Sequence, residues 1–308
     1  MDYFWVSNTA SLSNQENPPA IRGRVLCFCT EIKVTPAVDE EAKMFVDYLS
    51  GYIKKSKNGY YYANYESYQL ESYFQPIYDR EGVVFAYEGL VRVTTDQGER
   101  IPPDVFFESV YRDGSKEELV TMICVRLHLL NYTKLKAIHA NKKLFLNVSP
   151  TVFETQTSSV RALDLKYQMM LAIGITPEDI VYEIVEQPGK NIAQEIRGIK
   201  ALRKYGSSIA VDDFGSGCTT MKRVKSLTPD IVKIDKRLVQ NYTMFKNEIL
   251  ALIEHCRGLK MLVVAEGIES KQQLNYFKSL GVALFQGFLL ARPESVAFYT
   301  QQDEPLTV

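Results

Sequence analysis

Eight short runs rich in β-branched and aromatic residues recur along this chain, and from the second run onward helical patterns fill the intervals between them. The runs are 73–78, 83–91, 143–148, 180–185, 208–212, 231–234, 261–265 and 283–286. In the intervals, apolar residues recur every three or four positions, as in 119–130, 192–202 and 245–256, which predicts amphipathic helices. Eight strands alternating with helices over roughly 225 residues are typical of a (β/α)8 barrel. The sequence therefore predicts an α/β fold, a TIM-like barrel.

The first two runs are joined in a way that a regular barrel does not use. Only the four residues Asp79-Arg-Glu-Gly82 lie between them, whereas a parallel pair needs a crossover of about a dozen residues or more. We therefore expect a tight hairpin and a barrel whose first strand is antiparallel. Glycines at 206 and 281 follow helical patterns and predict helix ends there.

The first 68 residues differ in pattern from the rest. Residues 7–19 are polar and predict a loose segment, and the apolar spacing over 38–53 predicts one helix. Three tyrosines at 60–62 then lead into the barrel. We interpret 1–68 as an N-terminal extension with a regulatory or packing role, and 69–308 as the barrel domain. The tyrosines are expected to pack against the barrel, with stacking on a nucleotide base as the alternative.

Charge and composition exclude several classes of protein. Lys and Arg total 36 against 37 Asp and Glu, a net charge of −1, which argues against binding long nucleic acid through a basic surface. The sequence contains no run of 18 apolar residues, so it predicts no transmembrane helix. Its first residues lack the features of a secretory signal. Five scattered cysteines are expected to be reduced thiols. These features favour a cytoplasmic protein without membrane insertion.

Polar side chains stand where the predicted strands end, and this is the rim on which barrel enzymes carry their active sites. They are Glu88, Asn147, Glu183, Asp212, Asp213, Lys233, Glu266 and Gln286. Strand alternation also puts Leu90 and Arg92 on the face of Glu88, with Gly89 on the opposite face. The three histidines, at 128, 139 and 255, lie in helical patterns and are interpreted as core or surface residues.

Several carboxylates around one rim would repel one another and raise each other's pKa values unless a cation lay among them. Oxygen donors without nearby His or Cys favour Mg²⁺ or Mn²⁺ over Zn²⁺. Two such ions about 3.5–4 Å apart are an established device for hydrolysing a phosphodiester. The rim therefore predicts a site for two divalent cations.

These residues occur in motifs that carry a specific resemblance. The motifs are Tyr73-Phe-Gln-Pro-Ile-Tyr-Asp79, Glu88-Gly-Leu90 with Arg92, Leu146-Asn-Val-Ser149, Tyr182-Glu-Ile-Val-Glu186, Val211-Asp-Asp-Phe-Gly-Ser-Gly217, Val232-Lys-Ile-Asp235, Ala265-Glu-Gly-Ile-Glu269 and Phe285-Gln-Gly287 before Arg292-Pro293. In this order, over 73–293, the sequence resembles the EAL family of cyclic di-GMP phosphodiesterases. The resemblance implies hydrolysis of cyclic di-GMP to linear pGpG by in-line attack of water, with two Mg²⁺ or Mn²⁺ ions.

The resemblance also assigns roles to individual residues. Those matching the metal ligands are Glu88, Asn147, Glu183 and Asp212, with Asp213 serving the second ion. Those matching the catalytic centre are Glu266, as general base, and Lys233, near the attacking water. Those matching the substrate site are Gln75, Leu90, Arg92 and Gln286. Glu186 matches the glutamate that supports the loop after Asp213, near which the family forms a homodimer.

Departures from the family pattern are few. Gly89 replaces the signature alanine, and Val185 and Ser216 each replace a threonine. Because no metal ligand is lost, an active enzyme is favoured. Two alternatives remain open: a receptor that binds cyclic di-GMP without cleaving it, and an unrelated barrel glycosidase using two carboxylates, which would not need Asn147 or Lys233.

Overall fold

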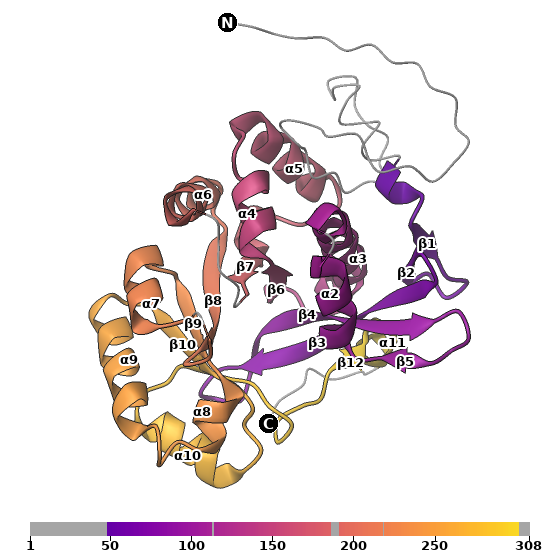
Figure 1. The fold of residues 1–308 in the computed structure, drawn as a ribbon. Coiled ribbons are helices and arrows are strands. Elements are labelled where there is room, and N and C mark those ends of the chain that lie inside the picture. The colour runs from indigo at the N-terminus through magenta and orange to yellow at the C-terminus, as the bar shows by residue number, and fades with distance from the viewer. Residues whose placement is uncertain (1–47, 113, 186–190, 218, 302–308) are drawn as a thin grey trace, which may run out of the picture.

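The structure is a computed structural model that describes residues 48–112, 114–185, 191–217 and 219–301. Within these residues a closed ring of strands forms the centre of the molecule (Figure 1). Its strands, in chain order, are β3 (Tyr68–Tyr78), β4 (Val84–Thr95), β6 (Lys143–Val148), β7 (Ile180–Ile184), β8 (Ser208–Phe214), β9 (Ile231–Ile234), β10 (Leu262–Ala265) and β11 (Leu284–Phe285). Each of the eight predicted runs overlaps one of these strands, so the predicted barrel is confirmed.

Strand β3 is the reversed member of the ring. It pairs antiparallel with both β4 and β11, whereas the pairs from β4–β6 round to β10–β11 are parallel. The hairpin before β4 is tight because Asp79 Oδ1 accepts hydrogen bonds from the backbone N–H groups of Glu81 and Val83, at 3.0 and 2.8 Å. Gly82 adopts a φ of 81° in this turn, a conformation that glycine enters without steric cost. The prediction of an antiparallel first strand is confirmed.

Helices surround the ring on its outer side (Figure 1). Their bounds are α2 (Pro103–Arg112), α3 (Gly114–Ile138), α4 (Pro150–Gln156), α5 (Val160–Ala172), α6 (Ile192–Tyr205), α7 (Met221–Leu227), α8 (Lys236–Gln240), α9 (Lys246–Gly258), α10 (Lys271–Ser279) and α11 (Val296–Thr300), with a 3₁₀ turn at Pro177–Asp179. Helix α6 ends as predicted at Gly206, whose φ is 103°. Among the described helices, none combines the length and apolar character needed to cross a membrane.

The interior of the ring is filled by one apolar layer to which every strand of the ring contributes a side chain. These side chains are Ile77, Ala86, Phe145, Val181, Ala210, Ile231, Val264 and Leu284, and each is at most 3% exposed. Layers of this kind make a barrel interior a packed core rather than a channel. We call this set the apolar layer. It supports the residues directly above it.

Outside the ring the first hairpin continues into a smaller sheet, which we call the outlying sheet. It consists of β1 (Ile53–Lys55), β2 (Tyr61–Tyr65), residues 68–73 of β3, residues 90–95 of β4, and β5 (Arg100–Ile101). A short strand, β12 (Glu294–Ser295), also pairs with β3. Most of the helix predicted over 38–53 lies outside the described residues. Its predicted end at Ile53 is wrong, since the chain turns after Ser50 and Ile53 pairs with Ala63 across the β1–β2 hairpin.

The outlying sheet is tied to helix α3 by buried polar contacts. The Asn131 side chain accepts a hydrogen bond from Tyr61 N–H and donates one to Tyr61 C=O, both at 2.9 Å. Arg126, which is fully buried, donates to Ser50 Oγ at 3.0 Å. Tyr61 is itself buried, and Tyr60 shares a 2.6 Å hydrogen bond with Thr300. The expectation that these tyrosines pack against the barrel domain is confirmed for Tyr60 and Tyr61.

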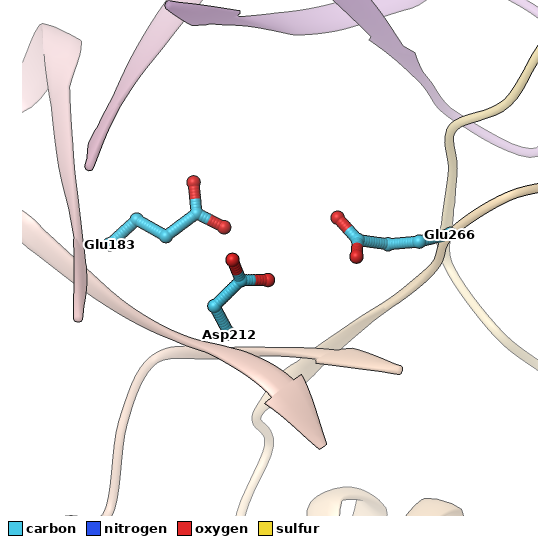
Figure 2. A group of neighbouring side chains, drawn as sticks. All are labelled: Glu183, Asp212 and Glu266. Atoms are coloured by element: carbon cyan, nitrogen blue, oxygen red, sulfur yellow. The ribbon is translucent and has the colours of Figure 1, made fainter. Parts of the chain in front are cut away.

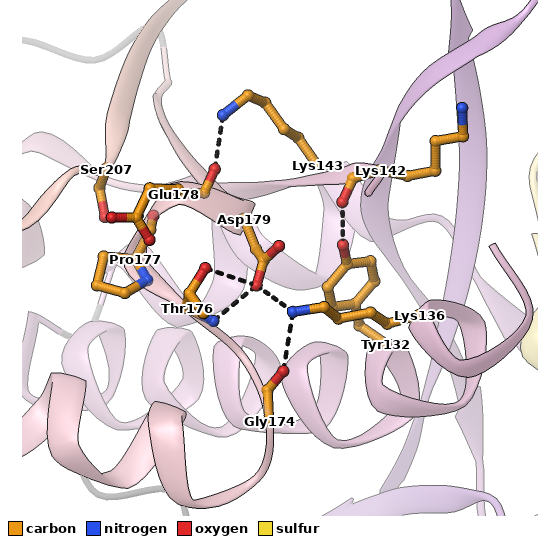
Figure 3. A network of polar contacts seen from close by, with 10 residues as sticks. All are labelled: Tyr132, Lys136, Lys142, Lys143, Gly174, Thr176, Pro177, Glu178, Asp179 and Ser207. Carbon is orange, nitrogen blue, oxygen red and sulfur yellow. Dashed lines mark hydrogen bonds and ion pairs between the residues drawn. The ribbon is translucent and has the colours of Figure 1, made fainter. Parts of the chain in front are cut away.

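A polar network lies at the opposite end of the barrel, beside the starts of β6 and β7 (Figure 3). Asp179 Oδ2 accepts hydrogen bonds from the backbone N–H and the hydroxyl of Thr176, at 2.6 and 3.1 Å. The same oxygen lies 2.5 Å from Lys136 Nζ, and the Asp179 side chain is only 13% exposed. Tyr132 donates to the carbonyl of Lys142 beside it. This network joins α3 to the turn before β7 and is distant from the strand ends that carry the predicted site.

Replacing Asp179 tests this network. Asp179→Ala removes the acceptor of both Thr176 hydrogen bonds and the partner of Lys136, so we expect unfolding free energy to fall by about 1–3 kcal/mol. Urea unfolding at pH 7 measures the change, with exposed Asp96→Ala as the control. Equal stability of the two variants would contradict a stabilising role for the network.

Candidate active site

A polar layer lies directly above the apolar layer, two residues further along each strand of the ring. Its members are Gln75, Glu88, Asn147, Glu183, Asp212, Lys233, Glu266 and Gln286. Because side chains on a strand alternate between its two faces, a step of two residues returns to the interior of the barrel. In the reversed strand β3 the step runs backwards, so that Gln75 precedes Ile77. The structure thus brings together seven of the eight predicted rim residues, all except Asp213, and adds Gln75, which the family resemblance assigned to the substrate site.

Lys233 lies at the centre of this polar layer. Among the described residues, four carboxylates lie within 4 Å of its Nζ: those of Glu88, Glu183, Asp212 and Glu266. The distances are 2.5 Å to Glu266, 3.3 Å to Asp212 and 3.6 Å to Glu88, and Glu183 is in direct contact. The lysine side chain is 1% exposed. One ammonium therefore neutralises part of a concentrated negative charge away from water.

Three of the carboxylates converge on one point (Figure 2). Ligand oxygens of Glu183, Asp212 and Glu266 all lie within 4.8 Å of one another. Glu183 is completely buried, its Oε1 is in direct contact with the Lys233 ammonium, and its Oε2 receives no hydrogen bond from the described residues. Converging buried carboxylate oxygens suit a hard divalent cation, which needs oxygen ligands. The residues present therefore fit a site for a divalent cation such as Mg²⁺ or Mn²⁺.

Glu88 is held in place by side-chain amides rather than by charge alone. Asn147 Nδ2 donates to one of its oxygens at 3.2 Å, and Gln286 Nε2 donates to the other at 2.7 Å. Gln286 also donates to Gln75 Oε1 at 3.1 Å, and Gln75 donates to the carbonyl of Ala291 at 3.0 Å. With its amide nitrogen committed to Glu88, Asn147 keeps its carbonyl oxygen available as a ligand. This chain of amides orients Glu88 towards Lys233.

Burial and like charges shift the pKa values of the cluster. Burial, followed by the charge of Asp212, raises the pKa of Glu183 well above its usual range. Burial also raises the pKa of Glu266, although the nearby Lys233 opposes the shift. Burial alone would lower the pKa of Lys233, but the surrounding carboxylates, Asp212 first, raise it well above its usual value. Shifts of this size in one cleft are characteristic of functional sites.

Two backbone features fix the strand ends that carry the site. Asp213 adopts a φ of 52°, an uncommon conformation for a residue other than glycine, and its N–H donates to Asp212 Oδ1 at 2.9 Å. Gly287 lies so close to Ile268 that any side chain would overlap the Ile268 backbone. Ile268 in turn donates to Gln286 C=O at 3.0 Å. The segments after Glu266 and Gln286 are therefore interlocked.

A cavity of about 430 Å³ opens above the cluster. It is lined by Gln75, Glu88, Leu90, Asp212, Asp213, Lys233, Lys236, Gln240, Glu266, Gly267, Glu269, Gln286, Gly287 and Phe288. The sequence patterns did not single out Lys236, Gln240 or Phe288, because these residues lie beyond the strand ends. No local sequence signal identifies them, because their position depends on how the segments after the strands fold over the end of the barrel.

Arg92 lies in a second, smaller cavity beside the first. This cavity measures about 220 Å³, and Leu90 lines both cavities, while Asn147 contributes to the second. The Arg92 guanidinium lies 5.1 Å from the ring centre of Tyr73. Glu186 lies outside the described residues. Apart from the fully buried Glu183, the predicted metal and substrate residues thus line two neighbouring cavities that share Leu90.

Comparison with known proteins agrees with this arrangement. Residues 62–293 match the sequence profile of the EAL domain. The chain is 29% identical over 241 residues to the cyclic di-GMP phosphodiesterase PdeF of Escherichia coli (strain K12), covering 75% of this chain but 31% of PdeF. It therefore spans about a third of the length of that relative.

Solved structures share the fold. The structure of PaMucR phosphodiesterase in complex with c-di-GMP superposes with a TM-score of 0.63 at 24% identity, over 74% of this chain and 93% of that one. The manganese/cy-diGMP complex of Klebsiella pneumoniae BlrP1 gives a TM-score of 0.60 at 24% identity, over 73% and 56% of the two chains. The profile match extends over most of the chain, from the outlying sheet to the end of the barrel, and so this chain belongs to the EAL domain family.

Proposed function

We propose that this protein is a metal-dependent phosphodiesterase that hydrolyses cyclic di-GMP to linear pGpG. The observation that carries the proposal is the polar layer around Lys233, which contains Glu88, Asn147, Glu183 and Asp212, the residues that match the family's metal ligands. Asp213, which matches the residue serving the second ion, directly follows Asp212. PdeF is named for this activity, and the PaMucR and BlrP1 structures contain the cyclic dinucleotide.

Two divalent cations, Mg²⁺ or Mn²⁺, are part of this proposal. Glu88, Asn147, Glu183 and Asp212 would hold one ion, and Asp213 would serve the other. When bound, such ions lower the pKa of a bound water and stabilise the charge of the in-line displacement. The convergence of the Glu183, Asp212 and Glu266 oxygens within 4.8 Å of one another supports this assignment.

The remaining residues of the cluster supply proton transfer and orientation. Glu266 has a raised pKa, which makes it a stronger base for the attacking water near neutral pH. Lys233 Nζ lies 2.5 Å from Glu266 and holds that carboxylate in place. Arg92 presents a planar fork suited to a phosphate, and Leu90, Gln75 and Gln286 shape the cavity for the substrate.

The loop after Asp213 and the oligomeric state complete the proposal. We infer from the family resemblance that Glu186 supports this loop and that the protein forms a homodimer near it. Analytical ultracentrifugation tests the dimer, and a monomer at micromolar concentration would exclude it.

A product assay tests the activity directly. The chain is incubated with cyclic di-GMP and Mn²⁺, and the products are separated by chromatography. We expect conversion to pGpG. Tight binding with intact substrate, in a protein that demonstrably contains Mn²⁺, would instead select the receptor alternative.

Removing one ligand tests the metal assignment. Glu88→Ala eliminates a carboxylate that contacts both Lys233 and the amide chain, so we expect turnover to fall at least about 100-fold. The matched control is Glu81→Ala, an exposed glutamate in the hairpin at the other end of the barrel. A turnover for Glu88→Ala close to that of the control would reject Glu88 as a ligand.

Metal binding should depend on pH. Burial, followed by the charge of Asp212, raises the pKa of Asp213 to about 7, so this carboxyl is protonated below pH 7 and must lose its proton to bind a cation. Mn²⁺ affinity should therefore increase between pH 6 and 8, by about tenfold per unit below that pKa for one released proton. Calorimetric titration at both pH values measures this. Asp213→Asn should reduce the dependence, and equal native affinities at the two values would refute the assignment.

A further inference from the structure

Gly89, which occupies the alanine position of the family signature, faces the outer side of the barrel and meets His128 of helix α3. A Cβ atom built on Gly89 would lie 3.0 Å from Cγ, 3.2 Å from Cδ2 and 3.3 Å from Cβ of His128. The imidazole therefore borders the volume that the signature methyl group would fill. The interpretation of His128 as a core residue in a helix is confirmed, but its contact with Gly89 could not be predicted, because the packing of α3 on the hairpin is not encoded in local sequence.

His128 has little freedom to move away. Its Nδ1 shares a 2.9 Å hydrogen bond with Ser72 Oγ on β3. Its ring meets Phe74 edge to face, with centroids 6.1 Å apart, and the residue is 4% exposed. In the register of the hairpin Phe74 pairs with Gly89. His128 thus contacts both strands of the hairpin at the point where it leaves the barrel.

We propose that His128 is a positioning residue that fixes the strand carrying Glu88. Gly89 directly follows Glu88, so a displacement of its backbone moves the Glu88 carboxylate relative to Lys233 and Asn147, which it meets at 3.6 and 3.2 Å. The glycine and the histidine form a matched pair: the missing methyl makes room for the ring, and the ring holds the backbone of β4 in place. The inference rests on the proposed function only in taking Glu88 as a metal ligand.

A double-mutant cycle tests the pairing. Native protein, Gly89→Ala, His128→Ala and the double variant are stripped of metal and titrated with Mn²⁺ by calorimetry, without any nucleotide. Gly89→Ala should weaken Mn²⁺ binding about tenfold in the native background, the range for residues that orient metal ligands. In the His128→Ala background the same change should alter affinity less than about twofold, since the obstructing ring is gone. Equal effects of Gly89→Ala in both backgrounds, or no effect in either, would overturn the proposal.

Controls separate positioning from folding and from catalysis. Gly258→Ala, whose added methyl would meet no described atom within 4 Å, should leave Mn²⁺ affinity unchanged. Thermal melts are recorded for every variant, and a Gly89→Ala protein that melts earlier but binds Mn²⁺ normally well below its melting temperature would reject positioning in favour of a purely structural contact. The cycle contains no substrate, so it tests the role of His128 independently of catalysis. A native protein that binds Mn²⁺ but does not hydrolyse cyclic di-GMP would contradict the proposed function, and the cycle would still test His128.

Discussion

The buried ammonium of Lys233 is the charge around which the site is organised. Four carboxylates face it, and in an interior of low effective dielectric their mutual repulsion is poorly screened. Burial first, and the neighbouring carboxylates after it, raise the pKa values of Glu183 and Glu266, so that bound protons offset part of the negative charge. Divalent cations would replace those protons and relieve the same repulsion. An arrangement that is costly for a folded chain alone is therefore suited to binding metal.

The barrel makes this concentration of charge geometrically feasible. The apolar layer provides one packed side chain per strand of the ring, and each polar residue stands two positions above it. Reversal of β3 does not disturb the layer, because alternation holds in both chain directions, and it places Gln75 opposite Glu88 in the hairpin. This packed support, together with the Lys233 ammonium, holds four carboxylates within a few ångströms of one another.

Much of the site follows from local sequence, because strand ends and alternation are local properties. Glu88, Glu183 and Asp212 were predicted at the rim from their positions in apolar runs, and the reversed strand followed from a four-residue connection. The contact between Gly89 and His128 could not be predicted, since it joins a strand and a helix about 40 positions apart and depends on how α3 packs. The β1–β2 hairpin was missed for a similar reason: Ile53 extends a helical pattern in sequence but pairs with Ala63 in space.

Helix α3 connects these regions mechanically. Asn131 binds the backbone of β2, and His128 contacts β3 through Ser72 and β4 through Gly89. Each buried hydrogen bond costs about 1–3 kcal/mol to break without replacement, so these contacts hold the β1–β2 hairpin, α3 and the β3–β4 hairpin in fixed positions relative to one another. Gly89, one of the residues that depart from the family pattern, lies within this packed region and directly follows Glu88.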